Sequence, residues 1–100
     1  MKIVTRMPRK APHEYALKRH YHKLGAYLQY SRQLSLLTQR KVAQRLGYSS
    51  AQFISNFERG IAAPPTWRMK VLAKMYKLDK DRMLELYLEG VRSQTLEHLK

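Results

Sequence analysis

Prolines and glycines divide this sequence into segments in which apolar residues recur at helical spacing, and no other feature restricts the fold so strongly. In the segment after Pro12 the apolar residues follow at intervals of four, three and four: Leu17, Tyr21, Leu24 and Leu28. Residues with this spacing lie on one face of an α-helix, and we expect that helix to end near Gln33. No alternating, strand-like pattern competes with it, so the chain is expected to be all-α.

A second and a third helix are expected to follow. The Thr38 hydroxyl can cap the second helix, which ends at Gly47. Ser49 or Ser50 can cap the third helix. The apolar residues of this third helix are Phe53, Ile54 and Phe57.

The fourth and fifth helices are expected to begin at a proline and at an aspartate. Pro65 suits the first turn of a helix, and Trp67, which follows it, is assigned to half-buried scaffold. Asp79 can cap the fifth helix, and Gly90 is its expected end. Apolar spacing continues beyond Gly90, so the tail at residues 91–100 either resumes the helix or frays.

The charge of the chain is strongly unbalanced. Its 20 Lys and Arg residues against 7 Asp and Glu give a formal net charge of +13, which is more than solubility requires. No acid occurs from Tyr15 through Phe57, and five of the seven lie after residue 78: Asp79, Asp81, Glu85, Glu89 and Glu97. One side of the molecule is therefore expected to face a polyanion. Residues 1–12 suit a flexible basic arm, and residues 13–90 suit a single domain.

Several classes of function find no support in the sequence. The absence of Cys excludes disulfides, thiolate zinc sites and cysteine nucleophiles. His20 and His22 diverge on a helix with no carboxylate beside them, so no metal site is expected. Nucleophile elbows, glycine-rich phosphate loops, secretory signals and apolar runs of membrane length are also missing. We therefore expect no catalysis, no cofactor, no small-molecule ligand and no membrane contact.

Two short helices joined by a tight turn, at about residues 38–46 and 50–59, are the elements of a helix-turn-helix. The sequence from Arg32 to Pro64 follows the pattern R(x5)TQ(x2)VA(x2)LGYSS(x3)IS(x)FE(x)G(x3)P. This pattern resembles the phage-repressor-like, XRE-type helix-turn-helix family over roughly residues 24–88. The resemblance implies a lambda-repressor-like DNA-binding domain of five helices, with the basic arm as an N-terminal extension.

A recognition helix that enters the major groove needs short polar side chains on its outer face and no acids, which phosphates would repel. The third helix offers such side chains, and the resemblance implies base contacts from Ser50, Ala51, Gln52, Ser55 and Asn56. Gln52 and Asn56 can each hold an adenine through two hydrogen bonds, worth about 1–3 kcal/mol of discrimination. Ala51 can at most touch a thymine methyl group. For Phe53 both a core position and a position facing the groove are open, and the core is favoured.

The resemblance also implies contacts to the DNA backbone and one structural ion pair. The family contacts phosphate at the start of the first motif helix, where helix amides point at the anion. The phosphate contacts expected in this chain are Thr38, Gln39, Arg40, Lys41, Ser49 and Arg59. In relatives, an Arg late in the first helix pairs with the acid that ends the recognition helix. Arg32 and Glu58 occupy these two places, and their pair is expected to lock the recognition helix to the scaffold.

The leading hypothesis is a transcriptional regulator of the repressor type that binds double-stranded DNA sequence-specifically as a homodimer. The expected dimer surface lies on the fifth helix and the tail: Leu84, Tyr87, Leu88 and Val91. Two alternatives stay open. One is an antitoxin-like or adaptor module that holds a second protein, and the other is a general nucleoid-binding protein that reads no bases. The resemblance implies a cytoplasmic, nucleoid-associated protein encoded by a bacterium or a phage.

Overall fold

The computed structural model describes residues 18–100, and within them the chain forms five α-helices and no strand. In chain order these are α2 (His22–Leu34), α3 (Gln39–Leu46), α4 (Gln52–Glu58), α5 (Thr66–Tyr76) and α6 (Lys80–His98). The expected all-α fold with five helices is therefore confirmed. The basic arm expected at residues 1–12 lies outside the described residues.

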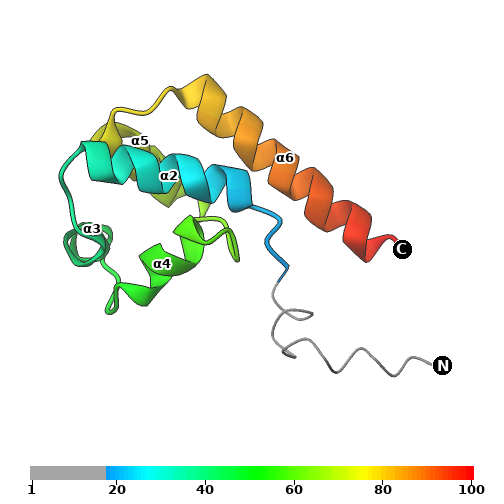
Figure 1. Cartoon of the computed structure of the whole chain (residues 1–100), viewed down its shortest axis with the longest axis horizontal. Coiled ribbons are helices and arrows are strands. Elements are labelled where there is room, and N and C mark those ends of the chain that lie inside the picture. The colour runs from blue at the N-terminus through cyan, green and yellow to red at the C-terminus, as the bar shows by residue number, and fades with distance from the viewer. Residues whose placement is uncertain (1–17) are drawn as a thin grey trace.

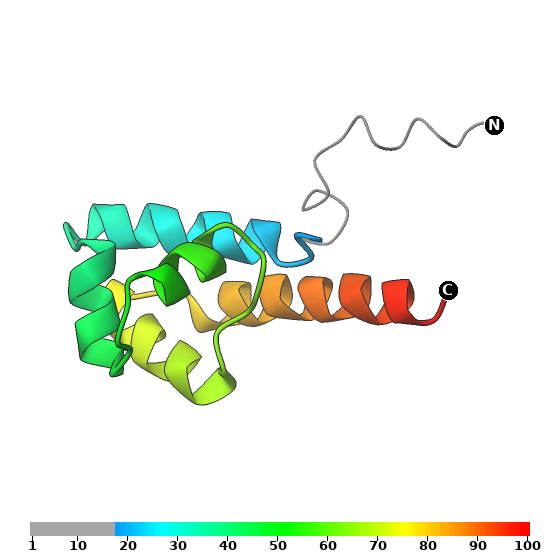
Figure 2. The ribbon, with the colours of Figure 1, turned by 90° about the horizontal axis from the view of Figure 1, so that it is seen from below.

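The first of these helices, α2, is the centre of the arrangement. It packs against α4, α5 and α6, and α3 packs against α4 (Figure 1). Figure 2 shows α2 and α6 side by side, with the last turns of α6 extending beyond the other helices. The most deeply buried side chains come from α2, α3 and α5: Leu24, Leu28, Val42 and Leu72. One apolar core therefore joins the helices, and α3 and α4 lie together at one end of the molecule.

Side-chain caps set the beginnings of two helices. The Thr38 hydroxyl accepts a hydrogen bond of 3.0 Å from the Lys41 amide, at the start of α3. A carboxylate oxygen of Asp79 accepts bonds of 3.0 and 3.2 Å from the amides of Asp81 and Arg82, at the start of α6. Both residues satisfy amides that have no partner within their helix. The two predicted caps are confirmed.

Gly25 allows α2 and α4 to approach each other closely. A Cβ atom at this position would overlap the backbone carbonyl oxygens of Phe57 and Glu58. These carbonyls belong to the last turn of α4, so they cannot move unless the helix moves. The glycine therefore fixes how near α4 lies to the scaffold.

The last helix, α6, runs through Gly90 without a break, so the expected end at this residue is wrong. Of the two alternatives for the tail, the helical one is correct as far as His98. Gly90 is buried, and a Cβ atom there would overlap the ring of Tyr21. That ring is held in place, because its hydroxyl donates a 2.9 Å hydrogen bond to Gln94 and its face stacks on Tyr87. The glycine thus serves helix packing and not helix termination.

Candidate nucleic-acid interface

The two motif helices and their turn form the helix-turn-helix, and its second helix begins later than expected. The recognition helix was expected to start at Ser49 or Ser50, but α4 begins at Gln52. The Ser50 hydroxyl accepts a 3.0 Å hydrogen bond from the Gln52 amide, two residues on. A serine bonded in this way stabilises a turn that precedes the helix. The predicted residues 49–51 therefore lie in the turn that precedes α4.

The outer face of α4 carries polar side chains. Ile54, Phe57 and Glu58 are buried, which turns Gln52 outward, where it is exposed. Asn56, one turn later, is half-buried and accepts a 2.9 Å hydrogen bond from the Gln52 side-chain amide. The remaining predicted base-contacting residues are exposed or half-buried: Ser50, Ala51 and Ser55. Neither amide side chain points into the apolar core.

A buried ion pair holds the end of α4 to α2. The Arg32 Nε atom donates to Glu58 Oε2 at 2.6 Å, and Nη2 donates to Oε1 at 3.2 Å. A third donor, Nη1, bonds the Leu37 carbonyl oxygen at 2.7 Å, in the connection before α3. The hydrogen bond to Glu58 raises the pKa of Arg32 above its usual range, although burial opposes this. The predicted ion pair is present, and it ties α4 to both preceding segments.

Gln39 belongs to this buried network, a role that the sequence did not indicate. Its side-chain amide donates a 2.9 Å hydrogen bond to Glu58 Oε1, and the residue is half-buried. Tyr76 of α5 lies near the same charges. Burial, followed by the negative charge of Glu58, raises the pKa of Tyr76. A phosphate contact by the Gln39 side chain can therefore use only its second N–H, while the first holds the recognition helix.

The cations on the outside of the motif have no acidic partners among the described residues. Arg40 and Lys41 on α3 and Arg59 after α4 are exposed, and none of them forms an ion pair within residues 18–100. Thr38 and Ser49, also predicted at the DNA backbone, are exposed as well. This end of the molecule therefore presents positive charge that is not compensated locally.

Acidic side chains gather instead along α6. Glu97 pairs with Lys18 at 3.8 Å and with Lys100 at 3.3 Å, and Glu89 pairs with Lys23 at 3.3 Å. The hydrogen bond from Lys100, with the positive charges nearby, lowers the pKa of Glu97. These acids lie on the second half of α6, which extends away from α3 in Figure 1, and they neutralise cations before and at the start of α2 and after α6. The charge asymmetry in the sequence is thus also an asymmetry in space.

An aromatic cluster beside the turn was not predicted. Phe53, expected in the core, is 43% exposed. Its side chain lies at the edge of the inner face of α4 that Ile54 and Phe57 occupy, where it packs on a residue from another segment. Its ring stacks on Tyr48, with centroids 4.4 Å apart and planes at 11°. The guanidinium of Arg68 lies 3.8 Å from the Tyr48 ring centroid.

Arg68 and Trp67, at the start of α5, complete this cluster. The guanidinium of Arg68 also lies 4.3 Å from the Trp67 ring, and its buried Nε atom has no hydrogen-bond partner within residues 18–100. Trp67 is 60% exposed, so its assignment to half-buried scaffold is wrong. No periodic pattern could have revealed this cluster, because Tyr48 lies in a turn and Arg68 belongs to another helix.

The apolar surface expected on the fifth helix is partly exposed. Leu84 and Leu88 are 53% and 52% exposed, whereas Tyr87 and Val91 are partly buried against the core. Between α5 and α6 lies a hollow of about 370 Å³. The apolar side chains that line it include Met69, Ala73, Met83, Leu84 and Tyr87. Leu84 belongs to both features, so the exposed leucines of α6 adjoin the hollow, whose lining also includes Thr66, Lys70 and Lys80.

No group of three or more His, Cys, Asp or Glu side chains within residues 18–100 could hold a metal ion. None of the helices α2 to α6 is long and apolar enough to span a membrane.

Comparison with known proteins agrees with this geometry. A family model described as a helix-turn-helix domain matches residues 23–86, which include all of α3, α4 and α5. The match is consistent with the resemblance to the XRE-type family. Comparisons with curated proteins and with solved structures returned no match. Helix-turn-helix domains indicate DNA-binding regulators and are typically not enzymes. The chain therefore belongs to the helix-turn-helix domain family.

Proposed function

We propose that this chain is a transcriptional regulator of the repressor type that binds double-stranded DNA sequence-specifically, with α4 in the major groove. The observation that carries the proposal is the outward position of Gln52 and Asn56 on this helix. Their amide groups both donate and accept hydrogen bonds, as the edges of adenine require. In the free protein the Gln52 side-chain amide donates one hydrogen bond to the Asn56 side-chain oxygen, and this bond gives way to bonds with bases. Ser50, Ala51 and Ser55 flank them as further base contacts.

Uncompensated cations around α4 support the same orientation. Exposed Arg40, Lys41 and Arg59 can contact phosphates on the two sides of the groove, with help from Thr38 and Ser49. Contacts of this kind position a protein on the duplex but carry no sequence information. They complement the polar face of α4, which supplies the sequence information.

The contacts that hold α4 in a fixed position also support direct reading of bases. Base recognition needs side chains held close to their productive geometry by a fixed scaffold. The bonds from Arg32 and Gln39 to Glu58, with the close approach at Gly25, supply such a scaffold. A protein that coats DNA without reading bases has no need of it.

We further propose that the chain acts as a homodimer through α6. Exposed Leu84 and Leu88, beside the apolar hollow between α5 and α6, suit a contact with the same surface of a second copy. Tyr87 and Val91 lie at its edge. A two-fold dimer of this kind binds half-sites about one helical turn apart, so its operator should be nearly palindromic.

Selection from a pool of random-sequence duplexes tests this function. The full chain is incubated with the pool at near-physiological salt, and the bound duplexes are recovered and sequenced over several rounds. We expect enrichment of a nearly palindromic site with half-sites about one helical turn apart. Recovery of duplexes without a common sequence, with an affinity that falls steeply with salt, would instead indicate general nucleoid binding.

A further inference from the structure

From the position of Phe53 we infer that this residue reads a thymine through its C5 methyl group, so that the DNA site contains a thymine next to the base contacted by Gln52. This inference rests on the proposed function, which it makes more specific. Phe53 directly follows Gln52 on α4, and its side chain is 43% exposed. It is the one large apolar side chain among the described residues of α4 that is not buried.

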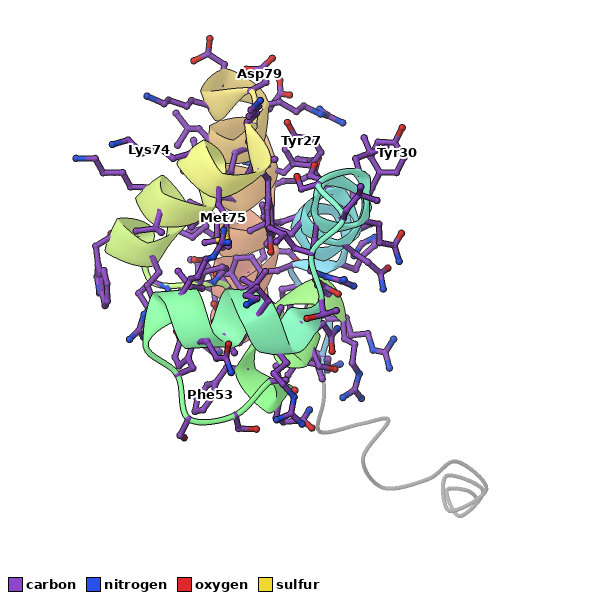
Figure 3. All side chains as sticks on the ribbon, turned by 90° about the vertical axis from the view of Figure 1, so that its left-hand side faces the viewer. Tyr27, Tyr30, Phe53, Lys74, Met75 and Asp79 are labelled. Atoms are coloured by element: carbon purple, nitrogen blue, oxygen red, sulfur yellow. The ribbon has the colours of Figure 1, made fainter. Side chains whose placement is uncertain are left out.

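The ring of Phe53 is held in position before any DNA is bound. It stacks on the Tyr48 ring. The centroid of the Tyr48 ring lies 5.9 Å from that of Phe57 and 3.8 Å from the Arg68 guanidinium. Figure 3 shows Phe53 at the lower end of the molecule, beside the connection between α3 and α4. Phe53 therefore does not have to lose side-chain freedom on binding, which favours specific contact.

The chemistry of the major groove then identifies what such a ring can contact. Base edges in this groove present hydrogen-bond donors, acceptors and one apolar group, the C5 methyl of thymine. An exposed phenyl ring cannot bond to the donors or acceptors, but it gains by covering the methyl group and excluding water from both. The exposed cations Arg40, Lys41 and Arg59 are better suited than a phenyl ring to contact the phosphates, because they are positively charged.

Ala51 is the other apolar residue at this end of α4, and it is a weaker candidate. Its side chain is a single methyl group, it is half-buried, and it lies before the first residue of the helix. Phe53 has a larger exposed surface and is braced from behind by Tyr48. The two residues make distinguishable predictions, because removal of only one of them should abolish the response to the methyl group.

The experiment removes the methyl group from the DNA and the ring from the protein. Each thymine of the selected duplex is replaced in turn by deoxyuridine, which differs only in lacking the C5 methyl. Binding is measured for the full chain and for Phe53→Ala, Phe53→Leu and Ala51→Gly. Tyr30→Ala is the matched aromatic control, because Tyr30 is 62% exposed and lies at the opposite corner of the view in Figure 3. Thermal unfolding of each variant verifies that it is folded.

We expect one thymine per half-site at which deoxyuridine weakens binding by about fourfold, the effect of roughly one buried methyl group. Phe53→Ala should lose this difference, whereas Phe53→Leu and Tyr30→Ala should keep most of it. Loss of the difference in Ala51→Gly but not in Phe53→Ala would assign the methyl contact to Ala51 and overturn the inference. The inference is overturned if no thymine responds, or if the response survives in Phe53→Ala. A failure to select any preferred duplex overturns the proposed function itself, so the two failures can be told apart.

Discussion

The Arg32 guanidinium donates two hydrogen bonds, of 2.6 and 3.2 Å, to the Glu58 carboxylate. These bonds join the end of α2 to the end of α4. Both residues are buried, with 9% and 7% of their surface exposed. Because water solvates neither buried charge well, each charge is stabilised mainly by the other. The pair therefore couples the position of α4 to the stability of the domain.

Removal of Glu58 should be costly. Glu58→Ala leaves the Arg32 charge buried without its partner, so we expect a loss of about 3–5 kcal/mol in the free energy of unfolding. Urea denaturation followed by circular dichroism measures this loss. Glu85→Ala is the control, because Glu85 pairs with Arg82 at 2.7 Å on the exposed surface of α6 and should cost less than about 1 kcal/mol. Equal losses in the two variants would contradict the structural role of Glu58.

At Gly90, helix propensity and packing have opposite effects on the free energy of unfolding when alanine replaces glycine. Alanine in a helix interior is favoured over glycine by about 1 kcal/mol, but a Cβ atom here overlaps the Tyr21 ring. We expect Gly90→Ala to lower the free energy of unfolding in the parent chain. In a Tyr21→Ala background, the same substitution should raise it. Stabilisation of the parent chain by Gly90→Ala would mean that the ring is not fixed as described.

Much of the scaffold was predictable because its signals are local. Thr38 and Asp79 bond to amides within their own first turns, and residues of that type at those places predict it. The end expected at Gly90 and the core position expected for Phe53 were wrong, because both depend on neighbours from other segments. A glycine that makes room for a ring looks, in sequence, like a glycine that ends a helix.

The candidate site was predictable to a different degree. The pair of Arg32 and Glu58 followed from the family pattern, but the bond from Gln39 to Glu58 could not be inferred from spacing alone. Nor could the contact of Arg68 with Tyr48, which joins two segments without a shared periodicity. The assignment of individual residues to bases and phosphates stays a prediction, which the experiments on DNA address.

The exposed cations of the motif should set the salt dependence of binding. Removal of one cation that contacts a phosphate reduces the magnitude of the slope of log K, the logarithm of the binding constant, against log salt concentration by about one. We therefore expect Lys41→Gln and Arg59→Gln each to reduce the slope in this way, on specific and random duplexes alike. Lys74→Gln is the control, because Lys74 is exposed and lies far from the motif in Figure 3. Slopes that match the parent chain in both variants would place the phosphates elsewhere.

The apolar face of α6 should control assembly. A charge at Leu88, which is 52% exposed, would be buried without a partner in the proposed dimer. We expect Leu88→Glu to be a monomer by light scattering at concentrations where the parent chain is a dimer. Leu34→Glu, at an exposed leucine at the end of α2, should leave the dimer intact. A parent chain that is monomeric alone but purifies with a stoichiometric second polypeptide would favour the adaptor hypothesis.

The most direct test of direct base reading by α4 is the affinity of Gln52→Ala and Asn56→Ala for the selected duplex and for a shuffled duplex of equal length. Thr95→Ala, an exposed polar site near the far end of α6, is the control. Each α4 variant is predicted to lose about 1–3 kcal/mol of binding free energy on the selected duplex. Binding to the shuffled duplex should stay nearly unchanged. If both variants bind the two duplexes as the parent chain does, α4 does not read the bases through these amides.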